Sequence, residues 1–373
     1  VNFNAAGAQS IAPFAYTFNN VTLSNSGAKT TTNATINGVL SMEGTATTTL
    51  TGTLTYGTNA TLQYNTLTAR TAGAEWITPF AATGGVIIAN TGKITLNAAK
   101  VFNASVPLTI QSGATLDTGN FQLTFGGNFV NNGGTFTAGS SPIVIANTMV
   151  TQSIAGFTTT GLVSMTKTAG IATLQGNVNG AGLTINGSGG TLNLGSGLTH
   201  TVTNVTLTNG TLNGGSSTLN VSGTWAGTTG FTANAGTINY SATAGGQTIA
   251  GVTYNNLTLS NTSGTDTAGG NLVVNGTLTT AAGGTLNMVT YDLSVANVTN
   301  SGTIRTQSLS ATPLTAGKTW GGTVQYDATT GAQTIVTGTY NNLTLSNTSG
   351  TDTAGSNLVV NGTLTTAAGG TLN

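Results

Sequence analysis

Short stretches in which apolar and polar residues alternate recur along the chain. Leu, Val and Ile are interleaved with Thr, Asn and Ser, as in residues 21–24, 204–208 and 271–275. Side chains of a β-strand point alternately to opposite faces, so a period of two predicts strands with one buried face. Thr, Val and Ile also favour the strand conformation because they are β-branched. The pattern predicts an all-β protein with no helix of any length.

Turn signals separate these stretches about every 7 to 10 residues. Asn-Gly pairs are strong turn formers because both residues tolerate a positive φ. We therefore expect the chain to turn at each of them. They stand at Asn37-Gly38, Asn186-Gly187, Asn209-Gly210, Asn275-Gly276 and Asn361-Gly362.

A long internal repeat is visible near the C-terminal end. Residues 252–287 and 338–373 are identical at 34 of 36 positions, with an offset of 86 residues. Weaker copies precede them, so that repeat units begin near Gln9, Gln152, Gln247 and Gln333. Near-identity of the last pair indicates recent duplication, which an extendable array tolerates.

A finer cadence inside each unit predicts the architecture. In residues 113–139 an apolar group recurs about every seven residues, and three such steps make roughly 20 to 25 residues, the size of one solenoid coil. We predict one continuous β-solenoid over residues 1–373, of roughly 17 coils, less regular at 57–110. A string of β-sandwich domains is the alternative. The lack of a fixed core Trp and of Pro-rich or charged linkers weighs against it.

The repeats resemble those of large bacterial surface proteins. YNNLTLSN and NLVVNGTLTTAAGGTLN, together with GATLDTGNFQLTFGGNFVNNGGTF, are similar to β-strand repeats of autotransporter-passenger-like and filamentous-haemagglutinin-like adhesins. The resemblance implies a right-handed parallel β-helix that is exported and displayed outside the cell. It implies a structural or adhesive role and carries no catalytic motif.

Both ends of the sequence match the interior of a repeat. Residues 1–11 are similar to 324–335, and Asn373 is equivalent to Asn287, after which the earlier copy continues. We therefore expect a processed chain or a piece of a longer array, with uncovered coils at its ends.

Charge is scarce, and this narrows the possible functions. Only 4% of the residues are charged, with 7 acidic and 7 basic residues, and there is no Cys. The absence of Cys excludes disulfides and thiolate metal sites. Without a basic excess there is no electrostatic basis for binding nucleic acid. Few charges also predict stability nearly insensitive to salt and pH, and few cleavage residues for trypsin-like proteases.

Pairs of carboxylates would indicate an enzyme, because parallel β-helices often act on polysaccharides. Glycosidases need two carboxyl groups within about 10 Å of each other. Coil stacking could bring together Asp266 with Asp292, or Asp327 with Asp352, which are about one coil apart. The composition favours isolated turn carboxylates instead, so no catalytic, cofactor-binding or metal-ligating residue is expected. The seven acids are Glu43, Glu75, Asp117, Asp266, Asp292, Asp327 and Asp352.

Four other features have simple structural interpretations. His200 is expected at an exposed polar position of a strand, since no Ser and Asp accompany it. Residues 187–190 are rich in glycine and are expected to form a turn. Tyr254 and Tyr340 recur at equivalent positions and could form an aromatic platform or cap the core. Thr-x-Thr pairs could bind ice if aligned on one face, but their positions drift along the sequence.

These observations predict a non-enzymatic extracellular structural protein. Its protomers would stack end to end through open solenoid ends into a filament or stalk at the cell surface. The alternative is a cell-surface adhesin that binds glycans or abiotic surfaces through Thr/Asn-rich faces. Ice binding and a polysaccharide-acting enzyme are less favoured. The expected partners are the chain itself and, for the alternative, glycans or surfaces, without nucleic acid, cofactor or membrane insertion.

Overall fold

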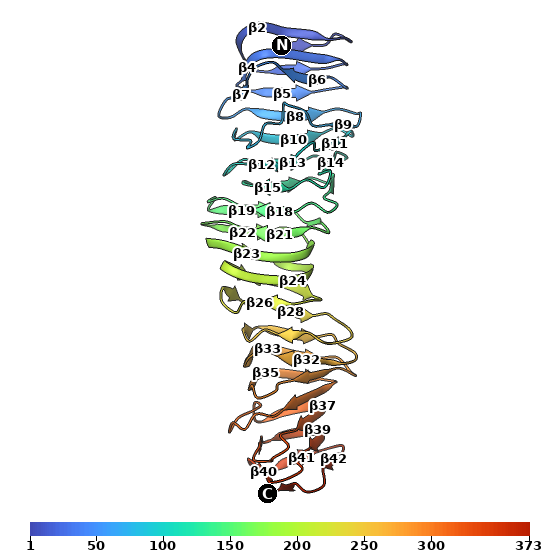
Figure 1. Ribbon diagram of the computed structural model, residues 1–373, viewed down its shortest axis with the longest axis vertical. Coiled ribbons are helices and arrows are strands. Elements are labelled where there is room, and N and C mark those ends of the chain that lie inside the picture. The colour runs from blue at the N-terminus through green and yellow to red at the C-terminus, as the bar shows by residue number, and fades with distance from the viewer. The chain divides into compact units, whose positions relative to one another are not determined.

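The protein, described here by a computed structural model, is an all-β solenoid of about 18 turns, built from parallel strands with no helix in the described backbone. The structure describes the backbone of residues 1–373 and every side chain except those of residues 12–14. The chain forms two compact units, unit 1 (Val1–Asn193) and unit 2 (Leu194–Asn373). Strands are stacked turn upon turn in each unit (Figure 1). The prediction of an all-β solenoid of about 17 coils is confirmed.

Most strands of unit 1 are short, and the longest are the second, the fourth and the last. They are β1 (Asn2–Phe3), β2 (Gln9–Phe18), β3 (Val21–Leu23), β4 (Ala28–Ile36), β5 (Val39–Met42), β6 (Thr47–Leu50), β7 (Leu54–Tyr56), β8 (Thr61–Asn65), β9 (Arg70–Thr71), β10 (Gly85–Ala89), β11 (Lys93–Thr95), β12 (Lys100–Val101), β13 (Leu108–Ile110), β14 (Thr115–Asp117), β15 (Leu123–Phe125), β16 (Phe129–Asn131), β17 (Thr135–Thr137), β18 (Ile143–Ile145), β19 (Thr151–Ile154), β20 (Phe157–Thr158), β21 (Leu162–Met165), β22 (Ile171–Leu174) and β23 (Val178–Asn193).

Unit 2 opens with its longest strand. Its strands are β24 (Ser196–Asn213), β25 (Ser216–Val221), β26 (Trp225–Ala226), β27 (Phe231–Thr232), β28 (Thr237–Tyr240), β29 (Thr248–Ile249), β30 (Thr253–Tyr254), β31 (Asn256–Leu259), β32 (Thr265–Ala268), β33 (Leu272–Thr280), β34 (Thr285–Asn287), β35 (Leu293–Asn300), β36 (Thr303–Thr306), β37 (Lys318–Tyr326), β38 (Thr334–Ile335), β39 (Gly338–Leu345), β40 (Thr351–Ala354), β41 (Leu358–Val360), β42 (Leu364–Thr366) and β43 (Thr371–Leu372).

The core consists of columns of apolar side chains that run from turn to turn. Alternate residues of each strand point inward, and the parallel register places each one on its equivalent about 20 residues later. Burial of each such side chain contributes about 1.5–3 kcal/mol. A column in unit 1, at most 2% exposed throughout, runs through Leu40, Leu62, Val86, Leu108 and Phe129.

We expected the Asn-Gly pair at residues 275–276 to separate two strands. It lies inside β33 instead. Tyr254 pairs with Val274 and Leu257 with Leu278, so β33 carries one extra residue, a β-bulge. Asn186-Gly187 and Asn209-Gly210 likewise lie within β23 and β24. The prediction of turns that separate strands was wrong at these three pairs, and at Gly276 the glycine is required because Asn256 Oδ1 and Asn255 O approach it closely.

An asparagine of the preceding turn satisfies the backbone at the bulge. Asn256 Oδ1 accepts a hydrogen bond from the Thr277 amide at 3.0 Å, and Asn255 O accepts one from the Gly276 amide at 2.7 Å. A Cβ atom at Gly276 would lie 2.4 Å from Asn256 Oδ1. The same Asn–Gly stacking recurs at Asn20 with Gly38, Asn204 with Gly223 and Asn342 with Gly362.

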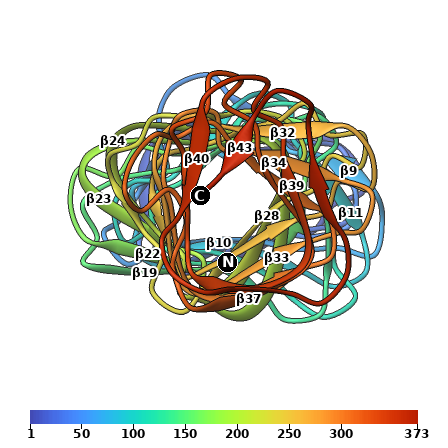
Figure 2. The same ribbon diagram turned by 90° about the horizontal axis from the view of Figure 1, so that it is seen from below.

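The two near-identical segments of unit 2 lie on different sides of the stack. Leu257 stacks on Leu278, whereas its copy Leu343 belongs to a column that begins at Asp266. That column reaches Leu343 in four steps, through Leu286, Ile304 and Val324. The 86-residue repeat therefore comprises four full turns of the solenoid plus one side of a further turn. Figure 2 shows β32, β34 and β39 along one side, and β40 and β43 on another.

Substitution of Gly276 by Ala should destabilise the protein by about 1–3 kcal/mol, because the methyl group would overlap Asn256 Oδ1 and Asn255 O. Gly7→Ala is the matched control, since a Cβ atom there meets nothing within 4 Å. Its effect should stay within about 0.5 kcal/mol. Urea unfolding followed by circular dichroism measures both, and equal stability of the two variants would contradict the steric account.

Candidate functional site

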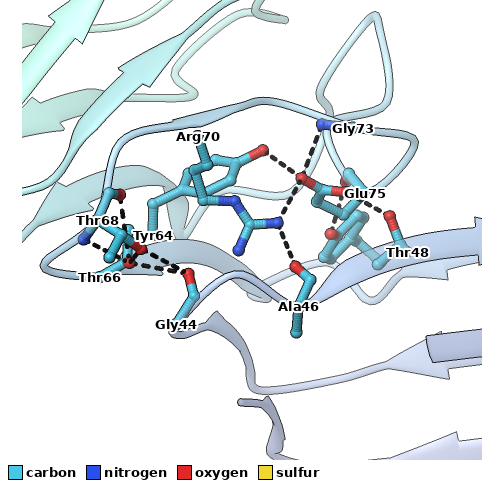
Figure 3. A network of polar contacts seen from close by, with 10 residues as sticks. Gly44, Ala46, Thr48, Tyr64, Thr66, Thr68, Arg70, Gly73 and Glu75 are labelled. Atoms are coloured by element: carbon cyan, nitrogen blue, oxygen red, sulfur yellow. Dashed lines mark hydrogen bonds and ion pairs between the residues drawn. The ribbon is translucent and has the colours of Figure 1, made fainter. Parts of the chain in front are cut away.

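A buried network of charged and polar groups surrounds Glu75, in the segment between β9 and β10 (Figure 3). Glu75 is fully buried, and its Oε1 accepts hydrogen bonds from the Tyr64 hydroxyl and the Gly73 amide, both at 2.8 Å. Thr48 donates to Oε2. Arg70 Nη2 lies 3.8 Å from Oε1 and donates to Ala46 O at 2.6 Å. The carboxylate thus fastens an irregular segment to the turn before it.

The surroundings of Glu75 suppress ionisation of the neighbouring tyrosines. Burial, and after it the negative charge of Glu75, raises the pKa of Tyr56 and of Tyr64 well above the usual value. The Tyr56 hydroxyl donates to Glu75 O at 2.7 Å. Both oxygens of the carboxylate have donors within the fold, so the network serves to hold the backbone. Removal of one partner of such a buried ion pair costs about 3–5 kcal/mol.

Three of the seven basic residues are buried and donate to backbone carbonyl groups. Lys29 Nζ donates to Ala5 O, Gly7 O and Ser26 O at 2.7–3.0 Å. Lys100 donates to Trp76 O at 2.7 Å, and Lys167 to Met149 O at 3.0 Å. Burial lowers the pKa of Lys100 and of Lys167. These three lysines are among the seven basic residues after which trypsin-like proteases could cut, and the folded chain encloses them.

The glutamines that mark the repeat units act as clasps between turns. Gln247 Nε2 donates to Val221 O at 2.9 Å and to Gly223 O at 2.8 Å, while its Oε1 accepts from the Ala242 amide. Gln333 makes the same set of contacts in the second copy. Gln152 Nε2 donates to Phe125 O and Gly127 O. One carboxamide therefore donates to two carbonyl groups of the preceding turn, one of which also accepts a backbone amide, as Val221 O does from Ser241.

An aspartic acid completes the clasp in both copies. Asp266 Oδ1 accepts from the Gln247 amide at 2.9 Å, and Asp352 Oδ1 accepts from the Gln333 amide at 3.0 Å. Both side chains are fully buried, and their Oδ2 atoms have no hydrogen-bond partner. Burial raises the pKa of both carboxyl groups, and this outweighs the lowering by the glutamine amide. The interpretation of all acids as turn carboxylates was wrong for these two.

The carboxylates considered as pairs are not brought together. Asp266 stacks on Leu286, not on Asp292. Asp327 forms an ion pair with Arg305 at 2.5 Å, whereas Asp352 belongs to the clasp of Gln333. Since a glycosidase needs two carboxyl groups beside one substrate, these acids do not form such a site.

Asp292 lines a groove of about 370 Å³ together with Leu272, Leu293 and Leu314. Asp292 is partly exposed, and its Oδ1 accepts hydrogen bonds from Ser308 Oγ at 2.6 Å and Ser310 Oγ at 2.9 Å. It is the one titratable residue of the groove lining. A single held carboxylate offers neither the acid–base pair of a hydrolase nor a set of metal ligands.

His200 and the two recurrent tyrosines lie in the interior. His200 is 1% exposed, with Nε2 2.8 Å from Leu194 O, so the expectation of an exposed strand position was wrong. Its inward place follows from the register, which stacks it on Leu219. Tyr254 and Tyr340 are fully buried and hydrogen-bond to Ala250 O and Val336 O. They are core residues and form no aromatic platform.

Comparison with known proteins gives no relative from which a role could be transferred. No family model, no curated protein and no solved structure matches the chain. Across the described side chains, His, Asp and Glu form no group of three that could hold a metal ion. No helix capable of spanning a bilayer occurs in the described part of the chain.

Replacement of Gln247 by Leu should destabilise the protein by about 1–3 kcal/mol, because Gly223 O loses the Gln247 donor, while Val221 O keeps only its hydrogen bond from the Ser241 amide. Gln325→Leu is the control, since Gln325 is partly exposed and bonds only to Ser346 Oγ. Its effect should be below about 1 kcal/mol. Urea unfolding of both variants tests the clasp, and a stability loss no larger for Gln247→Leu than for the control would refute it.

Acid should strengthen the fold through Asp266 and Asp352. Burial raises their folded pKa above the usual value, so the folded state holds their protons over a range where the unfolded chain has lost them. This contribution is complete below the unfolded pKa and is lost as the pH rises through the folded pKa. Relative to an Asp266→Asn/Asp352→Asn variant, the parent should therefore lose stability as the pH is raised from about 3 through the folded pKa of the two groups.

Thermal unfolding of parent and double variant across this pH range measures the difference directly. Comparison with the variant removes the contributions of all other titrating groups, which the two proteins share. A difference in melting temperature that does not change with pH would show that the two carboxyl groups titrate alike in the folded and unfolded chains.

Proposed function

We propose that this protein is a non-enzymatic extracellular structural element, a filament or stalk whose protomers stack end to end. One observation carries the proposal: side chains capable of chemistry are committed to the backbone of adjacent turns. Lys29, Gln247 and Asp266 are all buried and bonded in this way. Since these groups hold the stack of turns together, they support a structural role for the solenoid.

Apolar columns support the proposal of end-to-end association. Leu278 and Leu286 are 0% and 1% exposed because the following turn covers them. Every solenoid turn presents apolar columns at this same spacing, so a turn of one protomer is suited to cover a turn of another.

The alternative is an adhesin that binds glycans or abiotic surfaces through its Thr/Asn-rich faces. Outward rows of Thr and Asn in unit 2 favour it, for example Thr218, Thr237 and Asn256 in adjacent turns. Export to the cell surface is part of both proposals. It is supported by the resemblance of the repeats to bacterial surface proteins and by the scarcity of charge.

Electron microscopy of the purified chain at neutral pH should show long unbranched filaments, because the apolar columns of one protomer are covered by the next. Leu364→Asp should abolish them by placing a charge in the joint. Leu162→Asp is the matched control: Leu162 is 44% exposed, as a leucine on the side of a turn, and its substitution should leave the filaments intact.

Separate particles at every protein concentration would contradict end-to-end association and leave the adhesin as the stronger proposal. Filaments formed equally by both variants would place the joint elsewhere than at Leu364. Circular dichroism of the variants confirms that each keeps its strands before the images are compared.

A further inference from the structure

Unit 2 carries a face on which every outward residue of two adjacent rows is Thr or Asn over six successive turns. The rows lie two residues apart on each strand, so both point to the same side. We call this surface the Thr/Asn face. Its members, in pairs by turn, are Thr199 and Thr201, Thr218 and Asn220, Thr237 and Asn239, Asn256 and Thr258, Thr277 and Thr279, Asn297 and Thr299. Thr alone does keep drifting here, as expected, because the rows mix eight Thr with four Asn; the face is regular only in that every member is Thr or Asn.

The Thr/Asn face is uncharged and has small side chains beside it. Its residues are all partly or fully exposed. The next outward positions along the strands are small: Thr203, Ser222, Ser241, Ser260, Ala281 and Ser301. Residues 168–265 contain no Asp, Glu, Lys or Arg. Nothing larger than Asn and no charge therefore interrupts these rows.

Hydrogen bonds between turns hold the side chains of the face in place. Asn239 Nδ2 donates to Asn220 Oδ1 at 2.9 Å, and Asn220 Nδ2 donates to Thr201 Oγ1 at 3.4 Å. Asn256 Oδ1 accepts from the Thr277 amide, which carries the row across the bulge. Ordered donors and acceptors lose little entropy when a partner binds.

Neither composition nor duplication by itself accounts for the regularity of the face. The second copy of Asn256 and Thr258 lies on a different side, in rows that also contain Arg305 and Gln325. A row of outward residues in unit 1 passes through Gln63, Ile87, Thr109 and Val130. Other rows of this Thr-rich chain are thus mixed, whereas the Thr/Asn face is uniform.

The face requires a partner that is neutral, flat and periodic in two directions. Its groups repeat at about 4.8 Å from turn to turn and at about 6.7 Å along each strand. It has no aromatic side chain on which a sugar ring could stack. Six turns by two rows cover roughly 300 Å², below the about 800 Å² per partner of a stable protein interface. Crystalline polysaccharide and a second copy are therefore poorly matched.

We propose that the Thr/Asn face binds ice. The oxygen atoms on faces of hexagonal ice repeat at distances similar to those of the two rows. Hydroxyl and carboxamide groups can join such a lattice as donors and acceptors, and Thr methyl groups order the water between them. This activity is independent of filament formation, because the face lies along the side of unit 2.

The test is uptake of the purified full chain into slowly growing ice, with serum albumin as a protein that ice excludes. The parent should be enriched in the ice fraction. Thr258→Lys places a long charged side chain in the middle of the face and should reduce uptake to the albumin level. Thr303→Lys is the matched control, because Thr303 is an outward Thr in the row next to Arg305, and it should bind as the parent does.

Exclusion of the parent from ice would overturn the proposal, as would equal loss of uptake in both variants. Sedimentation of the parent with crystalline cellulose but not its uptake into ice would assign the face to a glycan instead. Circular dichroism and thermal unfolding show whether Thr258→Lys remains folded. If it does not, Asn239→Lys replaces it at the neighbouring turn of the same face.

Discussion

Parallel stacking requires each backbone amide and carbonyl group to find its partner one turn away. The requirement is met easily where neighbouring turns have equal length, and it fails at corners and bulges, where an extra residue breaks the ladder. Polar side chains satisfy backbone groups at such points. Asn256 accepts a hydrogen bond from the Thr277 amide, Gln247 donates to two carbonyl groups of the preceding turn, and Lys29 donates to three carbonyl groups.

The fold class could be read from the sequence because alternation and repeat length are local signals. Alternation identifies inward residues, and a cadence of 20 to 25 residues distinguishes a solenoid coil from a sandwich domain. Comparison of repeats also located Gln152, Gln247 and Gln333 as markers of the units. Their role as clasps could not be predicted from the sequence. The carbonyl groups that they bind lie 24 to 27 residues earlier, and only the register of the turns determines which carbonyl groups these are.

Burial of the polar residues was misjudged for the same physical reason. Charged and imidazole groups are usually exposed, so His200 and Asp266 were placed on the surface. A polar side chain is buried when an unsatisfied backbone group lies within its reach, and the sequence does not display which groups those are. The Asn-Gly pairs were misread in a related way. An Asn-Gly pair such as Asn275-Gly276 marks an irregularity, but only the pairing of the turns decides whether it is a turn or a bulge.

Because the 86-residue repeat comprises four turns plus one side of a turn, duplication of the repeat lengthens the solenoid without preserving the residues on any one face. Each added copy lengthens the stack, yet it moves every outward residue to the next side, as Leu257 and Leu343 show. A uniform face therefore cannot be extended by copying the 86-residue unit. It must be maintained by resemblance between adjacent turns, about 20 residues apart. Since the Thr/Asn face persists over six such turns within unit 2, its residues are constrained by something other than the duplication that lengthens the chain.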